Sequence, residues 1–278
     1  MSRKDRNIQI FQDTQCFYLG SVELMTAVAA TRRNQKMIPA GEPIPEAESE
    51  RERDAEIIVS DKRTLEAAKA YKGKKTCVLN FAAATRPGGG VLGGSGAQEE
   101  SICRCSTLYP CLDTPDMWNS FYNPHRAART RLYNDDMIYS PDVMVIKTDT
   151  SEPERLEEKD WYPVNVITCA APNLRWSHHF EEMEAAEITE EELRVLLESR
   201  IRRIFQEAAA EGNEVLILGA FGCGAFHNPP TLVADVFRKM TEEYRRYFET
   251  IEYAVFHVGK ESENYLAFKE AFETMTGS

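Results

Sequence analysis

Two adjacent carboxylates, Glu99 and Glu100, follow a glycine-rich segment and are the residues best suited to general acid–base chemistry. Six glycines lie between residues 88 and 96. Ordering so many glycines costs conformational entropy, and backbone N–H groups that approach an anion closely would offset that cost. A helix beginning near Gln98 would add its positive end. The pattern favours a diphosphate ligand beside the two carboxylates; the alternatives are a flexible surface loop and an acidic pair that only complements the helix dipole.

The pKa values of Glu99 and Glu100 are left open by the sequence. Two neighbouring carboxylates repel each other, so one of them should hold a raised pKa, and burial under a substrate would raise it further. The start of a helix has the opposite effect, because it favours the charged form.

A second glycine-rich turn, Gly219 to Phe226, also follows an apolar segment and leads toward a helix. Phe226 could pack on a sugar or a base, or it could be an ordinary core aromatic. We expect His227 to lie on the surface. The first glycine segment fits no known nucleotide fingerprint. It lacks the Gly-Lys-Ser/Thr of a Walker loop, and it lacks the acidic residue that a dinucleotide site needs about 20 residues later.

Strands and helices alternate from residue 55 onward. Apolar runs without alternation predict strands that are covered on both faces. We expect such strands at residues 57–59, 76–82, 143–146, 164–169, 215–218 and 253–256, and helices at 64–71, 98–108, 189–212, 231–248 and from 262. The result is a three-layer α/β/α sandwich with a mixed central sheet. Ligands bind beyond the carboxyl ends of such strands, so the two glycine segments can face one cleft.

The N-terminal part differs from the rest of the chain. Residues 5–35 are expected to be helical, and residues 37–56 combine prolines with a dense run of charges that is typical of a linker or surface loop. We therefore expect an N-terminal helical extension over residues 1–54 and a catalytic domain over residues 55–278.

The net charge of the 278 residues is −12, from 33 Lys and Arg against 45 Asp and Glu. This argues against general binding to nucleic acid or to anionic membranes. No apolar run reaches the roughly 20 residues of a membrane span, and no apolar signal core follows the charged first residues. The odd number of seven cysteines favours a reduced compartment, the cytoplasm, or the nucleus as well in a eukaryote.

Other candidate site residues are weaker. Cys103, Cys105 and Cys111 do not have the spacing of a zinc site, and packing is the simpler explanation for them. His178 and His179, beside Trp176, are expected to lie in a surface loop rather than to contact a ligand. We expect Asp149 to be solvated.

The sequence resembles the bacterial, microbial-type branch of the poly(ADP-ribose) glycohydrolases. The triple glycine at 88–90 is followed after seven residues by Gln98-Glu99-Glu100, and similar segments recur in order at 78–82, 106–109, 139–141, 171–173 and 219–226. The resemblance runs from about residue 75 to residue 257. It implies a macrodomain fold, which agrees with the sandwich expected from the apolar pattern.

The resemblance also implies roles for particular residues. Glu100 would be the catalytic acid/base, and Glu99 would position the ribose. Phe226 would orient the ribose at the scissile end. The remaining substrate-binding residues, which would contact ribose hydroxyls or the diphosphate, are Asn80, Gly88, Gly89, Gly90, Gln98, Gly222, Cys223, Gly224 and Ala225. The family often has Arg and Asp-Pro where this chain has His227 and Pro229, which bears on contacts to the leaving group.

The function implied is hydrolysis of the ribose–ribose bonds of poly(ADP-ribose), which releases ADP-ribose and reverses ADP-ribosylation. Adjacent residues of one helix cannot easily flank a glycosidic bond, so we expect one acid/base rather than two opposed carboxyls, and neither a cofactor nor a metal. The substrate would be the polymer or an ADP-ribosylated macromolecule. Two alternatives stay open: a module that binds ADP-ribose without hydrolysing the polymer, and a hydrolase that acts on mono-ADP-ribosylated targets.

Overall fold

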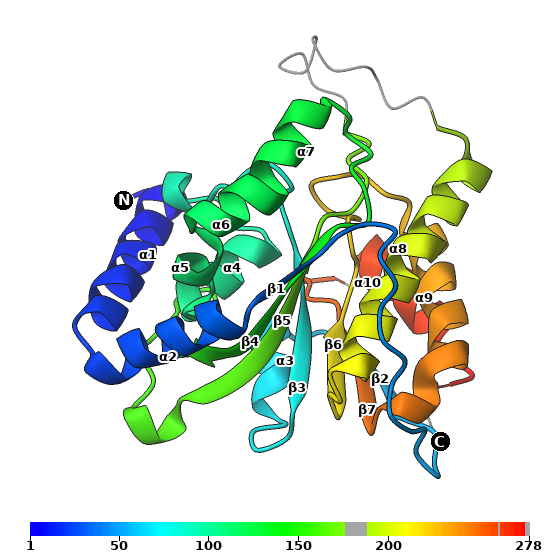
Figure 1. The fold of residues 1–278 in the computed structure, drawn as a ribbon, viewed down its shortest axis with the longest axis horizontal. Helices are drawn as coiled ribbons and strands as arrows, with labels where there is room; N and C mark the ends of the chain where they lie inside the picture. Colours follow the sequence, from blue (N-terminus) through cyan, green and yellow to red (C-terminus); the bar gives the residue numbers. More distant parts are fainter. Residues whose placement is uncertain (176–187, 261, 276–278) are drawn as a thin grey trace.

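The computed structural model describes residues 1–175, 188–260 and 262–275 and has three layers, with a seven-stranded sheet between two groups of helices (Figure 1). The strand order is β1-β4-β5-β3-β6-β7-β2. The strands are β1 (Lys36–Ile38), β2 (Glu56–Ser60), β3 (Thr76–Phe81), β4 (Met137–Val145), β5 (Tyr162–Cys169), β6 (Val215–Leu218) and β7 (Thr250–Ala254). The expected sandwich with a mixed sheet is confirmed.

The five strands β5, β3, β6, β7 and β2 pair in parallel. At the other edge of the sheet, β4 pairs antiparallel with β5, and β1 pairs antiparallel with β4. The central strands β3, β5 and β6 are buried almost throughout. Their continuous apolar sequence follows from this position, because helices cover both faces of a parallel sheet. The carboxyl ends of β3 and β6 therefore project in the same direction, toward one edge of the sheet.

One face of the sheet is covered by α8 (Glu190–Ala210), α9 (Pro230–Tyr244) and α10 (Glu263–Ala271) (Figure 1). Helix α8 begins with the expected capping box, in which Thr189 and Glu192 bond to each other's backbone. Ser262 caps α10 in the same region of the fold. The apolar side chains of these helices form one hydrophobic core with strands β3 to β7.

The other face is covered by the helices of the N-terminal half. They are α1 (Arg3–Leu19), α2 (Val22–Asn34), α3 (Thr64–Lys69), α4 (Gln98–Cys105), α5 (Leu108–Leu112), α6 (Pro115–Met117) and α7 (Asn123–Ala128), with a π-helical turn (Trp118–Tyr122) between α6 and α7. A second hydrophobic core lies beneath them. The helix expected over residues 98–108 ends at Cys105, because Ser106 forms a β-bridge with Val145.

The first 54 residues pack closely on the rest of the chain. The Asn7 side chain donates a hydrogen bond to Gly94 O, and the Thr14 hydroxyl donates one to Arg104 O, so α1 lies against the first glycine loop and α4. Strand β1, which the sequence did not predict because three residues carry no periodicity, pairs with β4. Whether residues 1–54 form a separate extension stays a prediction.

None of the described helices has the length and apolar composition needed to cross a membrane.

Candidate functional site

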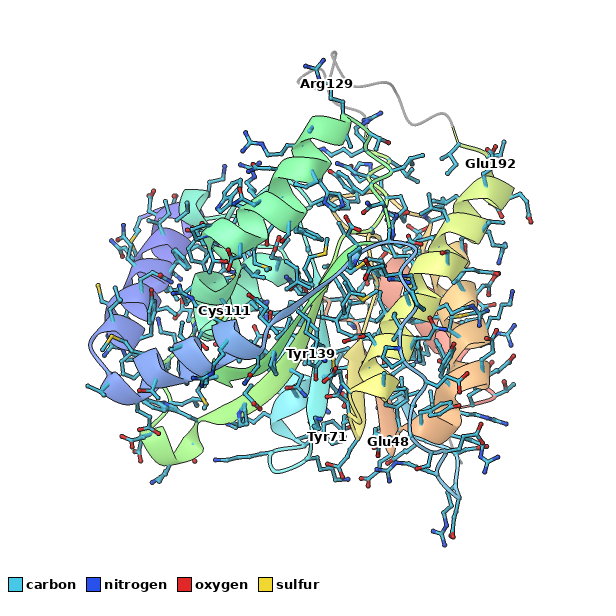
Figure 2. The ribbon with its side chains drawn as sticks, in the orientation of Figure 1. Glu48, Tyr71, Cys111, Arg129, Tyr139 and Glu192 are labelled. Atoms are coloured by element: carbon cyan, nitrogen blue, oxygen red, sulfur yellow. The ribbon has the colours of Figure 1, made fainter. Side chains whose placement is uncertain are left out.

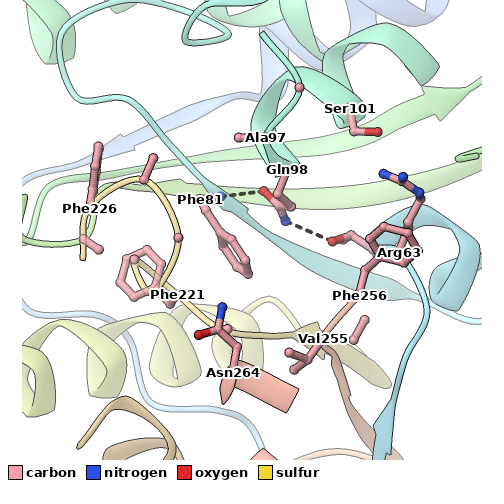
Figure 3. A pocket seen from close by; sticks show the side chains of 18 of the residues that line it. Arg63, Phe81, Ala97, Gln98, Ser101, Phe221, Phe226, Val255, Phe256 and Asn264 are labelled. Atoms are coloured by element: carbon pink, nitrogen blue, oxygen red, sulfur yellow. Dashed lines mark hydrogen bonds between the residues drawn. The ribbon is translucent and has the colours of Figure 1, made fainter. Parts of the chain in front are cut away.

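The candidate site lies where two glycine loops meet at the carboxyl ends of β3 and β6 (Figure 3). The first loop joins β3 to α4, and the second joins β6 to α9. A cavity of about 280 Å³ opens between them. Residues from both loops line it, as do residues from α3 and from the segment that follows β7, so the expected convergence of the loops on one cleft is present.

Glu99 and Glu100 occupy the first turn of α4 and are buried, with exposed fractions of 3% and 7%. The Glu99 carboxylate accepts a hydrogen bond of 2.8 Å from the Ala83 N–H. The Glu100 Oε1 atom accepts one of 2.8 Å from the Gly90 N–H. The backbone of the first glycine loop thus holds both carboxylates in place.

The second oxygen of Glu100, Oε2, is buried and has no hydrogen-bond partner among the residues that the structure describes. An unsatisfied buried carboxylate oxygen is energetically costly, so such an atom needs a reason. Glu100 thus has one oxygen that the loop fixes and one without a partner in the described part of the chain.

Asn80 lies at the end of β3, behind Glu99, and is fully buried. Its Nδ2 atom donates to Glu99 Oε1 at 3.4 Å and to the Thr168 hydroxyl at 3.2 Å. The structure therefore places Asn80 where it orients Glu99. Direct contact between Asn80 and a ribose stays a prediction.

Burial raises the pKa of Glu99 to about 8, and the negative charge of Glu100 adds to this effect. The hydrogen bond from Ala83 N–H opposes the rise but does not cancel it. Loss of hydration is therefore larger than the stabilisation of the Glu99 carboxylate by its hydrogen bonds. Glu99 is accordingly neutral near pH 7.

Gln98 connects α4 to β3 and α3. Its Oε1 atom accepts a hydrogen bond from Phe81 N–H, and its Nε2 atom donates to Leu79 O and to the Thr64 hydroxyl (Figure 3). This bracing fixes the start of α4, and with it the direction of both glutamates. Gln98 also lines the cavity, so a substrate contact remains compatible with its position.

The second loop presents unused backbone donors. The N–H groups of Gly224, Ala225 and Phe226 make no hydrogen bond within the described part of the chain, and these three residues line the cavity. Opposite them lies the N-terminus of α4, whose first N–H groups have no partner within the helix. Two sets of backbone donors therefore face one cavity, which is suited to an anion.

Five of the predicted site residues line the cavity: Gln98, Gly222, Gly224, Ala225 and Phe226. The others, Asn80, Gly88, Gly89, Gly90, Glu99, Glu100 and Cys223, do not line it but lie in or directly behind the same two loops. The sequence missed the lining residues at the far end of the cavity, among them Arg63, Thr64, Phe256 and Asn264. Of these, Phe256 follows a predicted strand end and could have been found by that signal.

The expectation that Asp149 is solvated was wrong. Asp149 is 5% exposed and lines the cavity. Its carboxylate accepts hydrogen bonds from the Ser101 hydroxyl at 2.7 Å and from Leu65 N–H at 3.0 Å, which ties α4 to α3. Burial raises its pKa above the usual value. The prediction for Asp149 failed because its two partners lie 48 and 84 residues earlier in the chain.

The remaining candidates take no visible part in the site. Cys103, Cys105 and Cys111 are buried with free thiols, and no group of His, Cys, Asp or Glu within the described ranges is arranged to bind a metal ion. His227 does not line the cavity. The predicted surface residues Trp176, His178 and His179 lie outside the described residues.

Comparison with known proteins identifies similar folds. Residues 9–148 match the model of the catalytic domain of microbial-type PARG, where PARG stands for poly(ADP-ribose) glycohydrolase. No curated protein sequence matches the chain. The solved PARG from Thermomonospora curvata is 28% identical and has a TM-score of 0.78, with 97% of this chain and 99% of that chain covered.

The PARG from Deinococcus radiodurans, solved in complex with ADP-ribose, also resembles this chain in fold and over most of its length. One crystal form is 31% identical with a TM-score of 0.73, and the alignment covers 89% of this chain and 98% of that chain. The family model spans half of the chain, and the similarity to both solved structures extends over most of it. The chain therefore belongs to the microbial-type poly(ADP-ribose) glycohydrolase family.

Proposed function

We propose that this protein hydrolyses the ribose–ribose bonds of poly(ADP-ribose) and releases ADP-ribose, with Glu100 as the acid/base. The observation that carries this assignment is the Glu100 carboxylate, which Gly90 N–H holds by one oxygen while the other oxygen is buried and unpartnered. Family membership and the solved complexes of similar proteins with ADP-ribose support the substrate.

The two loops provide a binding site for the diphosphate of ADP-ribose. Backbone donors at Gly224, Ala225 and Phe226 would contact the phosphates from one side, and the start of α4 would attract their charge from the other. The first loop would complete the cradle at Gly88 to Gly90. Because the protein as a whole is strongly acidic, binding depends on these local dipoles rather than on net charge.

The reaction follows from one acid/base group. In its protonated form Glu100 donates a proton to the oxygen that leaves C1 of the terminal ribose, and the C1–O bond breaks to give an oxocarbenium-like centre. The Glu100 carboxylate then takes a proton from the water that attacks C1, which restores the acid. The neighbouring phosphates would stabilise the developing positive charge. Glu99, oriented by Asn80 and Ala83, would hold the hydroxyls of the same ribose.

The products of the reaction test this function. Incubation with free poly(ADP-ribose) should release ADP-ribose, whereas a mono-ADP-ribosylated protein should be processed at least about 100-fold more slowly. Chromatography of the products checks both. Release from the single-unit substrate alone would replace the proposal with mono-ADP-ribosyl hydrolysis. Binding of ADP-ribose with no product from either substrate would identify a binding module.

The raised pKa of Glu99 predicts a loss of activity in alkaline solution. Glu99 is neutral below its pKa of about 8, and a negative charge forms beside Glu100 as the pH rises through that value. That charge repels the diphosphate and alters the hydrogen bonds to the ribose, so kcat/KM should fall above pH 8. In Glu99→Gln, which cannot ionise, this alkaline decrease should be absent even though the rate is lower overall. The same decrease in Glu99→Gln would assign it to another group.

The acceptor side of the substrate, a polymer chain attached to a protein or another macromolecule, would lie outside the cavity.

All seven cysteines are free, and five of them are buried in the core. This supports a reducing location, and we infer the cytoplasm.

A further inference from the structure

A surface beside the scissile end of the site combines aromatic rings with arginines. It consists of Trp118 in the π-helical turn, Arg126 in α7, Arg129 at the end of α7 and Tyr133 in the following loop. We call these four residues the α7 rim. Figure 2 shows Arg129 at the end of α7, at the same edge of the molecule as the loops that follow the strands.

The α7 rim is continuous with the site. The ring of Tyr133 lies 6.2 Å from the ring of Phe226, which lines the cavity, and 5.9 Å from the ring of His125 in α7. A chain that leaves the scissile ribose in this direction passes over the α7 rim.

Within the described ranges, no carboxylate forms an ion pair with either arginine of the rim. Arg126 and Arg129 are exposed and lie one turn apart, an arrangement in which like charges repel. Neither forms an ion pair with a described carboxylate; Arg126 instead lies 5.8 Å over the Trp118 ring. In a protein of net charge −12, two adjacent guanidinium groups that have no ion pair in the described part of the chain are unusual.

Three acidic residues nearby, Asp113, Asp135 and Asp136, have partners in the described part of the chain. Asp113 accepts hydrogen bonds from Trp118 Nε1 and from the Tyr109 hydroxyl, and so it holds the indole ring in place. Asp135 binds Arg200 and Ser199 on α8. Asp136 accepts from Ala40 N–H and from the Asn134 side chain. Of these three carboxylates, only Asp135 pairs with an arginine, and that arginine is Arg200 rather than a residue of the rim.

Resting on the proposed function, we propose that the α7 rim binds the leaving part of the polymer, the ADP-ribose units on the acceptor side of the cleaved bond. Arg126 and Arg129 pair with its phosphates, and Trp118 or Tyr133 stacks on its adenine base. Arginines interleaved with aromatic rings bind single-stranded nucleic acid by the same combination of charge and stacking. The rim would thus favour polymer substrates over single ADP-ribose units.

The test compares two double variants with the same change in net charge, each combined with Glu100→Gln so that the polymer stays intact. One is Arg126→Glu with Arg129→Glu. The control is Arg33→Glu with Arg53→Glu, two exposed arginines on α2 and before β2. Affinity for long poly(ADP-ribose) should fall about 10-fold in the rim variant and less than about twofold in the control, and the rim variant should show a weaker salt dependence.

Free ADP-ribose separates the rim from the cavity. Its affinity, measured by calorimetry, should be unchanged in the rim variant because the cavity residues are intact. Replacement of both rim arginines by lysine, which keeps the charge, should retain most of the polymer affinity. Equal losses in the rim and control variants, or a parallel loss of ADP-ribose binding, would overturn the proposal. Failure of the proposed function is a separate result: the otherwise unaltered protein would then release no ADP-ribose from polymer.

Discussion

The Glu100→Gln variant is expected to lose at least about 10³-fold in kcat for release of ADP-ribose from poly(ADP-ribose). A positioned acid/base contributes roughly 10²–10⁴-fold to a rate, and in the proposed mechanism the one group serves both proton transfers. The amide cannot donate a proton to the leaving oxygen or accept one from water. Binding should survive, because Gln has the same shape and its Oε1 can still accept the hydrogen bond from Gly90 N–H.

Two measurements isolate this effect from a loss of structure. The affinity of the variant for ADP-ribose, determined by calorimetry, should be within about threefold of that of the unaltered protein. Glu191→Gln, at an exposed glutamate in the first turn of α8, removes the same charge and should keep full activity. Undiminished turnover in Glu100→Gln would mean that another group transfers the proton, and the proposed mechanism would have to be abandoned.

The layers of the fold could be predicted because each central strand has its own unambiguous signal. The strands at β3, β5 and β6 are continuous apolar runs, and α8 carries both a capping box and an apolar face. Strand β1 was missed because it is defined by its partner β4 rather than by any pattern of its own. The expected linker from residue 37 therefore begins inside the sheet.

The residues of the site could be predicted only where they form a continuous motif in the sequence. The glycine loops and the glutamate pair occur as continuous motifs, and the structure brings both loops to one cavity. The far end of the cavity is built from residues that are distant in the chain, such as Arg63, whose guanidinium lies 3.9 Å over the Phe256 ring. Asp149 was missed for the same reason. Contacts of this kind depend on topology, and a single sequence does not encode them in any short motif.

Gly89 shows why the first loop requires glycine at a position that does not line the cavity. Its φ of +55° lies in the left-handed region, where a side chain costs roughly 1 kcal/mol. A Cβ atom there would lie 2.6 Å from Glu100 Oε1 and 2.8 Å from Glu99 Oε2. Both distances are too short for any real contact, so at least one carboxylate would have to move. Absence of a side chain at residue 89 therefore allows both glutamates to be buried side by side beneath the loop.

The Gly89→Ala variant should consequently lose about 10²-fold or more in kcat/KM, since displacement of a catalytic group by about 1 Å has an effect of this size. Gly93→Ala is the matched control: it lies in the same loop, its φ is not positive, and a Cβ there meets nothing within 4 Å. It should remain within about twofold of full activity. Kinetics with poly(ADP-ribose), together with thermal unfolding of both variants, distinguish a displaced carboxylate from an unfolded loop. Equal activities in the two variants would show that the glutamates tolerate displacement, which contradicts a mechanism that depends on the exact placement of Glu100.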